Sequence, residues 1–347
     1  MFYIHKAICI SPQQTLSENG IKELKESVKN KLHAIEPSYE GIPVKILRRM
    51  GKAVRIGIGA AMPLLQNNNE PLSGIIIGSA MGGMEDCINF LNQVIDYNEG
   101  MLTPTNFVQS TPNAIASQLG LLSKNKGYNI THVHRGLSFE NAVIDAEMLL
   151  KEAPENNYLL GGVDEISTYN YNIDYLANFF KKEQLSNIDL YTSGSTGSMA
   201  GEGAAMFLVN GNPSNALATM RAIHILHSTD ENFVSDQLKQ FLKVNLGPAE
   251  EIDLFLSGEN GDNRLLKFYT SCETVVGKAA TVARYKHMSG EYPTSSAMAV
   301  WLTCTILQKN FVPDHMLKTS TVKNNFKRLL IYNTFRGAQH SFILVEI

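Results

Sequence analysis

The stretch THVHRGLSFENAVIDAEMLLKEAPENNYLLGGVDE, residues 131–165, contains two different hydrophobic patterns. Residues 142–153 place apolar side chains at helical spacing and predict an amphipathic helix. Residues 157–165 form a short apolar run with two glycines, which is typical of a buried strand. Residues 131–142 lie where another strand gives way to the helix. This strand–helix–strand order predicts an α/β fold.

The same alternation continues through the rest of the chain. Further strands are expected in 73–83, 202–210 and 251–263, a strand pair around a tight turn in 328–347, and an apolar helix in 295–309. The mixed composition of residues 210–240 indicates a joint between two halves, 1–215 and 216–347.

The bulk composition excludes several classes of protein. The 347 residues are 44% hydrophobic and 18% charged, with a net charge of -3. This is an ordinary globular composition without the basic stripe of a nucleic-acid-binding protein. No apolar run is long enough for a membrane span, and the N-terminus lacks the pattern of a signal peptide. Four widely spaced cysteines match neither a zinc site nor a disulfide framework, so a cytoplasmic location is expected.

Six segments, in order, resemble motifs of the β-ketoacyl-acyl-carrier-protein synthase family of the thiolase fold. They are IIIGSAMGGMED (75–86), TPTNFVQSTPNAIASQLGL (103–121), YLLGGVDEIS (158–167), GSMAGEGAAMFLV (197–209), RYKHMSGEYPTSSAMAVWL (284–302) and NTFRGAQHSFILVEI (333–347). The resemblance implies a five-layer αβαβα fold of two similar halves, the second one shortened. It also implies a dimer, formed through residues 103–121 and the strand before Gly136.

The chemistry implied by the resemblance requires a cysteine at a helix start and two histidines. Counting back from Gly161 without gaps places the cysteine position at Gly136, which has no side chain. The first histidine position falls at Gly258 or Glu259, and the second falls at Glu291. An ionised Glu291 would have the wrong sign to stabilise an enolate. The resemblance therefore implies an acyltransferase-family homologue that does not condense on its own.

Chain-length factors of polyketide systems also lack the cysteine, and they pair with an active synthase. The sequence is most similar to such proteins of aryl-polyene and flexirubin-type pathways. By this resemblance the expected partners are an active ketosynthase and, through it, an acyl carrier protein, in a homodimer or a heterodimer. No cofactor, nucleic acid or membrane partner is expected.

The altered site also allows a re-purposed enzyme that acts on an acyl thioester without a covalent intermediate. Its candidate pocket comprises His132, His134, Arg135, Ser138, Glu140, Glu259, Asp262, Lys286, Glu291 and Phe335. In the structural interpretation, Arg135 and Glu140 instead pair with Glu259 or Glu291 and fill the site. The re-purposed enzyme predicts polar groups that converge around a cavity with an open tunnel, whereas the non-condensing partner subunit predicts a plugged or salt-bridged site.

Two further hypotheses depend on the histidines. Ser138 would be a nucleophile if His134 served as its base. The His132–His134 pair would be the start of a metal hydrolase site, but no third or fourth ligand occurs at a fixed spacing. The sequence therefore favours structural or pocket-lining histidines over a metal site.

Overall fold

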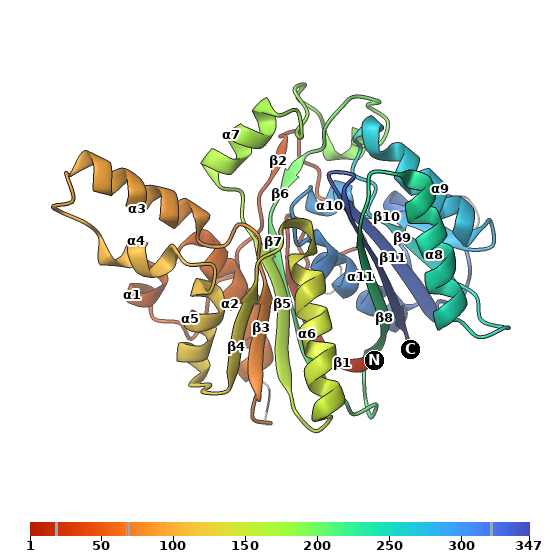
Figure 1. The fold of residues 1–347 in the computed structure, drawn as a ribbon, viewed down its shortest axis with the longest axis horizontal. Coiled ribbons are helices and arrows are strands. Elements are labelled where there is room, and N and C mark those ends of the chain that lie inside the picture. The colour runs from red at the N-terminus through yellow and green to blue at the C-terminus, as the bar shows by residue number, and fades with distance from the viewer. Residues whose placement is uncertain (18–19, 67, 69, 320–321) are drawn as a thin grey trace.

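The computed structural model describes residues 1–17, 20–66, 68, 70–319 and 322–347 (Figure 1). A ten-stranded sheet has the order β10-β9-β11-β12-β8-β1-β7-β5-β3-β4. Its first five strands along the chain are β1 (Phe2–Ile10), β3 (Gly74–Gly78), β4 (Tyr128–His132), β5 (Tyr158–Asp164) and β7 (Gly203–Asn210). The others are β8 (Ala218–His227), β9 (Leu254–Ser257), β10 (Thr281–Arg284), β11 (Arg328–Phe335) and β12 (Gln339–Glu346).

The sheet consists of two halves with one topology. In the first half, β1 pairs antiparallel with β7, β7 pairs antiparallel with β5, and β5, β3 and β4 are parallel. In the second half, β8, β12, β11, β9 and β10 repeat these directions in the same order. A short antiparallel ladder between β1 and β8, at Phe2, Tyr3 and Ile4, joins the halves. The predicted construction from two similar halves is therefore present.

Helices fill the remaining three layers. Helices α2 (Lys52–Gln66) and α5 (Ala114–Ser123) cover the outer face of the first half, and α8 (Glu231–Asn245) and α9 (Leu266–Val276) cover the second. Helices α6 (Ser138–Glu152) and α11 (Ser295–Lys309) lie between the halves and contact strands of both. The middle helix layer and each of the two outer helix layers pack on the sheet through an apolar core of their own. This is the predicted five-layer αβαβα fold.

Close packing places α6 in the middle layer. A Cβ atom on Gly78, at the end of β3, would lie 2.5 Å from the Cα atom of Phe139 on α6. Only glycine permits this approach, so the start of α6 is held against the sheet. The predicted helix at 142–153 is part of α6, and the predicted strand at 157–165 contains β5.

The remaining elements are short or peripheral. They are α1 (Val44–Leu47), α3 (Met84–Asp96), α4 (Pro104–Gln109), α7 (Thr168–Leu176), α10 (Lys286–Ser289), β2 (Lys31–Leu32), β6 (Ala200–Gly201), and the 3-10 turns η1 (Arg135–Leu137), η2 (Asn187–Asp189), η3 (Asn263–Leu265) and η4 (Asp314–Met316). Helices α3 and α4 project from the body as an arm (Figure 1). Within the described ranges, no helix is both long and apolar enough to cross a bilayer.

Candidate functional site

The turn between β4 and α6 is a tight elbow. Arg135 has φ +51°, a left-handed conformation that is uncommon for a residue with a side chain. The Ser138 hydroxyl accepts a hydrogen bond from the His134 N–H at 2.8 Å and donates one to the Arg135 carbonyl at 2.8 Å. Ser138 is buried, and its proton is held by a backbone carbonyl. In this geometry Ser138 stabilises the elbow rather than donating its proton to the His134 ring.

The elbow has no room for a side chain at Gly136. A Cβ atom there would lie 2.1 Å from the Cβ atom of Phe335 and 2.4 Å from its Cγ atom. The Gly136 N–H donates to Oε1 of Gln339 at 3.0 Å. Both Phe335 and Gln339 come from the β11–β12 hairpin, which therefore closes the elbow. The position that would need a nucleophile is occupied by a phenyl ring, and its backbone donor is already bound to a carboxamide.

Residues of the turn after β9, where the first histidine position is expected, form ion pairs. Glu259 is buried and accepts from Arg284 at 3.1 Å and from Lys318 at 2.6 Å. Gly258 packs against Asn333. Asp262 caps η3 by accepting from the Arg264 N–H at 3.1 Å, and it also forms an ion pair with the Arg264 side chain. These carboxylates are therefore engaged in structural contacts.

The second histidine position is also part of an ionic contact. The Glu291 carboxylate lies 2.9 Å from Nζ of Lys286, which is completely buried. Asn260 donates to the other oxygen of Glu291 at 2.9 Å, and Lys286 also donates to Ser295 on α11. Asn260, which follows Glu259 in the chain, thus connects the turn after β9 to Glu291. The arrangement neutralises Glu291 with an internal cation and leaves no imidazole donor for an enolate oxygen.

Glu140 lies in the middle layer and does not meet Arg135. Its Oε1 accepts from Ser341 at 2.8 Å, while its Oε2 has no hydrogen-bond partner among the residues that the structure describes. Burial raises the pKa of Glu140 to about 7, although the hydrogen bond from Ser341 and, more weakly, the positive charge of Lys286 oppose this shift. Arg135 is exposed. The predicted salt bridge of Arg135 with Glu259 or Glu291 is not among the ion pairs found in the described part of the chain.

The two elbow histidines have separate partners. His132 lies 2.9 Å from Asp145 on α6. The His134 ring is exposed and lies 5.5 Å from the ring of His227 on β8. No group of three potential metal ligands occurs in the described part of the chain.

The structure brings only some of the sequence-predicted residues together. Lys286 and Glu291 form one group with Asn260 and Ser295, and Glu259, which precedes Asn260 in the chain, forms a second group with Arg284 and Lys318. His132, His134 and Arg135 belong to neither group. Sequence reasoning missed Gln339, although the departure of NTFRGAQH from a glycine-rich closing motif was a visible signal.

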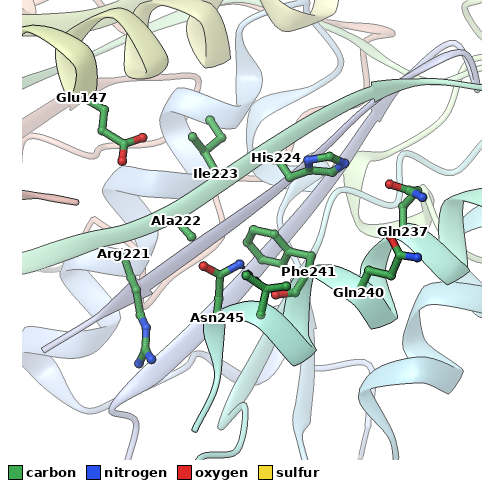
Figure 2. A pocket seen from close by; sticks show the side chains of 10 residues that line it. Glu147, Arg221, Ala222, Ile223, His224, Gln237, Gln240, Phe241 and Asn245 are labelled. Atoms are coloured by element: carbon green, nitrogen blue, oxygen red, sulfur yellow. Dashed lines mark hydrogen bonds between the residues drawn. The ribbon is translucent and has the colours of Figure 1, made fainter.

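The main pockets lie elsewhere. One of about 380 Å³ opens between α6, β8 and α8 (Figure 2). Its lining includes Glu147, which binds Lys151, and Arg221, which binds Glu250 and Glu346. None of the candidate site residues lines this pocket. This pocket is therefore separate from the elbow.

Known structures share this architecture over the whole chain. A ketosynthase (ApeO) in complex with its chain length factor (ApeC) from Xenorhabdus doucetiae matches with a TM-score of 0.77 and 12% identity, covering 100% of this chain and 98% of that one. The ishigamide ketosynthase/chain length factor gives 0.77 and 12%, covering 99% and 98%. A β-ketoacyl synthase from Burkholderia phymatum STM815 gives 0.76 and 14%, covering 99% and 98%.

The fold is therefore that of the ketosynthases, within the thiolase-like class of α/β proteins. Residues 23–176 match the model of the β-ketoacyl synthase N-terminal domain. No curated protein sequence gives a significant match.

Proposed function

We propose that this chain is a ketosynthase-like subunit that does not condense acyl groups and that acts as a chain-length-factor-like partner of an active ketosynthase. The proposed setting is the cytoplasm, in fatty-acid-like or aryl-polyene-type polyketide biosynthesis. The acyl carrier protein would meet the complex through the active subunit. The observation that carries the proposal is the closed elbow, where Phe335 fills the space beside Gly136.

A second observation is that no cysteine substitutes for the missing nucleophile. Burial raises the pKa of the Cys272 and Cys304 thiols to about 12 and raises that of Cys9 as well. Cys87 lies on α3, in the arm. An acyl-enzyme requires a thiolate at the start of α6, and none of the four cysteines lies there.

A third observation is a surface suited to a partner. Strand β4 is an edge of the sheet, and exposed apolar side chains cover the neighbouring arm. Exposed apolar surfaces of this kind mark sites of protein association. Complexes of a ketosynthase with a chain length factor are among the structures with this fold.

The proposal is tested by a condensation assay. The isolated protein is incubated with acyl-loaded and malonyl-loaded carrier protein, with an active ketosynthase as positive control. We expect no product and no acyl adduct in the intact-protein mass spectrum. The protein is then added to an active ketosynthase, where we expect a change in product chain length. Turnover by the isolated chain, or an unchanged product pattern in the mixture, would refute the proposal.

A further inference from the structure

A serine and a buried lysine meet on the loop that precedes β6, outside the elbow. Lys181 has no solvent-accessible surface, although lysine is almost never fully buried without an acidic partner. No ion pair among the described residues includes it. Its Nζ lies 2.8 Å from Oγ of Ser195, which is half-buried. This distance is within the range for a nucleophile and its general base.

The contacts of Lys181 fit a neutral amine as well as an ammonium group. Besides the Ser195 hydroxyl, its Nζ contacts the carbonyl oxygens of Gly261 at 3.0 Å and of Ser195 at 3.3 Å. A neutral amine has two N–H donors and one lone pair, which match two carbonyls and one hydroxyl. Burial lowers the pKa of Lys181, although the negative charges of Glu183 and Asp262 oppose this shift. Lys181 therefore loses and regains a proton without changing its partners.

The loop that carries Ser195 is open on one side. Gly194 has φ +62°, and a Cβ atom there would meet no other heavy atom within 4 Å. The side chain of Asn263 donates to the Gly194 carbonyl at 2.7 Å, which holds the loop on η3. The N–H groups of Ser195 and Thr196 have no acceptor within the described ranges. Backbone donors are thus free near the hydroxyl, as a carbonyl oxygen that gains negative charge requires.

Glu183 is the resting partner of the hydroxyl. Its carboxylate is exposed and accepts a hydrogen bond from Ser195. This hydrogen bond lowers the pKa of Glu183, so the carboxylate is ionised and competes with Lys181 for the serine proton. Asp262, the other acidic group that faces Lys181, is paired with Arg264. The hydroxyl is therefore activated only in the fraction of molecules in which Lys181 is neutral.

We infer that Ser195 is a nucleophile with Lys181 as its base, and that the pair hydrolyses small acyl esters. Oγ of Ser195 bonds to the acyl carbon, and its proton passes to Nζ of Lys181, which then protonates the departing alcohol or thiol. A water molecule next attacks the acyl-serine and gives one proton to Lys181. That proton returns to Oγ as its bond to the acyl carbon breaks, and the free acid leaves. The acyl-serine is an intermediate that water consumes.

This inference goes beyond the proposed function and does not depend on it, because hydrolysis forms no carbon–carbon bond. The experiment follows the release of 4-nitrophenolate from 4-nitrophenyl acetate by the full chain, after subtraction of the rate in buffer. We expect a rate that rises with pH to an inflection below 10.5, the ordinary pKa of lysine.

Variants of the pair are compared with matched controls on the same loops. We expect Ser195→Ala and Lys181→Met each to lower the rate about tenfold or more. The controls Ser193→Ala and Lys182→Met should retain the wild-type rate, since Lys182 is exposed and Ser193 does not contact a lysine. A fluorophosphonate probe should label the peptide that contains Ser195 in mass spectrometry. Circular dichroism verifies that each variant is folded.

The substitution Glu183→Gln distinguishes a reactive pair from a structural contact. It removes a competing acceptor and a negative charge that favours the ammonium form of Lys181. We expect the inflection to move to lower pH and the rate at pH 8 to rise about threefold. Equal hydrolysis by the wild type and Ser195→Ala, or an inflection that Glu183→Gln leaves in place, would overturn the inference. An acyl adduct on residues 131–142 in the condensation assay would contradict the proposed function and leave this inference standing.

Discussion

At the candidate site, charged side chains are buried, whereas on the arm, apolar side chains are exposed. Lys286 and Glu140 have no solvent-accessible surface, while Ile95 is 74% exposed. Both regions reverse the usual distribution of side chains. At the site, each buried charge other than that of Glu140 is matched by an opposite charge within the chain. On the arm, no described residue of the chain covers the exposed apolar side chains. The charged groups of the site therefore find their partners within the chain, whereas the apolar side chains of the arm do not.

The two halves of the fold also differ in the helices between their equivalent strands. Between β3 and β4 the first half carries α3, α4 and α5, whereas between the equivalent strands β9 and β10 the second half carries only η3 and α9. Since α8 and α9 cover the second half-sheet as α2 and α5 cover the first, α3 and α4 have no counterpart in the second half and are not needed to build the layer. Their retention is consistent with a role outside this chain.

The largest expected effect comes from breaking the buried network. Lys286→Met removes the cation that neutralises Glu291 and lies near Glu140, while the methionine retains much of the side-chain volume. We expect the free energy of unfolding to fall by about 3–5 kcal/mol, because the partly buried Glu291 carboxylate loses the cation that neutralises it. Urea denaturation followed by circular dichroism measures this loss.

The matched control for that substitution is Lys151→Met. Lys151 is also paired with a glutamate, at 2.9 Å, but its side chain is 64% exposed. We expect a change of less than about 0.5 kcal/mol in the control. Equal losses in the two variants would contradict a buried ionic network at the site.

A smaller effect is expected from the protonation of Glu140. Its pKa is about 7 in the folded chain, against an ordinary value of 4.5. A raised acid pKa means that the folded chain holds this proton more tightly. The resulting stabilisation is fully present below about pH 4.5 and is lost as the pH rises through 7. Glu140→Gln keeps an oxygen acceptor for Ser341 but cannot ionise.

The variant should therefore gain stability relative to the wild type as the pH rises. From pH 4.5 to pH 8 we expect a relative gain of about 2–3 kcal/mol. Burial raises the pKa of Asp164 to about 6 and that of Glu165 to about 7. Both carboxyls are present in the two proteins, so their contributions cancel in the comparison. Urea denaturation at a series of pH values measures the difference, and a difference independent of pH would show that Glu140 is not protonated in the folded chain.

Much of the fold could be predicted from the sequence because its strands are short apolar runs bounded by turn residues. The run at 295–309 is α11, and the pattern at 328–347 is the hairpin of β11 and β12. Their arrangement into five layers came from the resemblance of ordered motifs. Local pattern alone does not determine which half-sheet a strand joins, since that depends on pairings across the whole chain.

The site could be predicted only in part. An ungapped count placed Gly136 at the elbow, and Lys286 and Glu291 are close in sequence, so Gly290 at φ +69° needs only to turn the chain between them. The closure by Phe335 and Gln339 depends on a hairpin about 200 residues away, and no local pattern reports its position. The exposure of Arg135 depends on a left-handed backbone conformation that a non-glycine residue seldom shows.

The smallest effect on stability is expected for a substitution on the arm, because its side chains are exposed whereas those of the site are buried. Ile95→Ser removes a large apolar side chain that already contacts water. We expect the free energy of unfolding to change by less than about 0.5 kcal/mol. Leu160→Ala, at a fully buried position of β5 in the central core, should cost about 2–5 kcal/mol. Urea denaturation of the isolated chain measures both.

The same Ile95→Ser substitution should weaken association with the partner, because the apolar atoms removed are those a partner would bury. This opposite behaviour in stability and binding is what distinguishes an interaction surface from a poorly packed helix. If Ile95→Ser instead destabilised the isolated chain by more than about 1 kcal/mol, the side chain would be packing within its own molecule. The arm would then be part of the core, and its exposed apolar surface would need no partner.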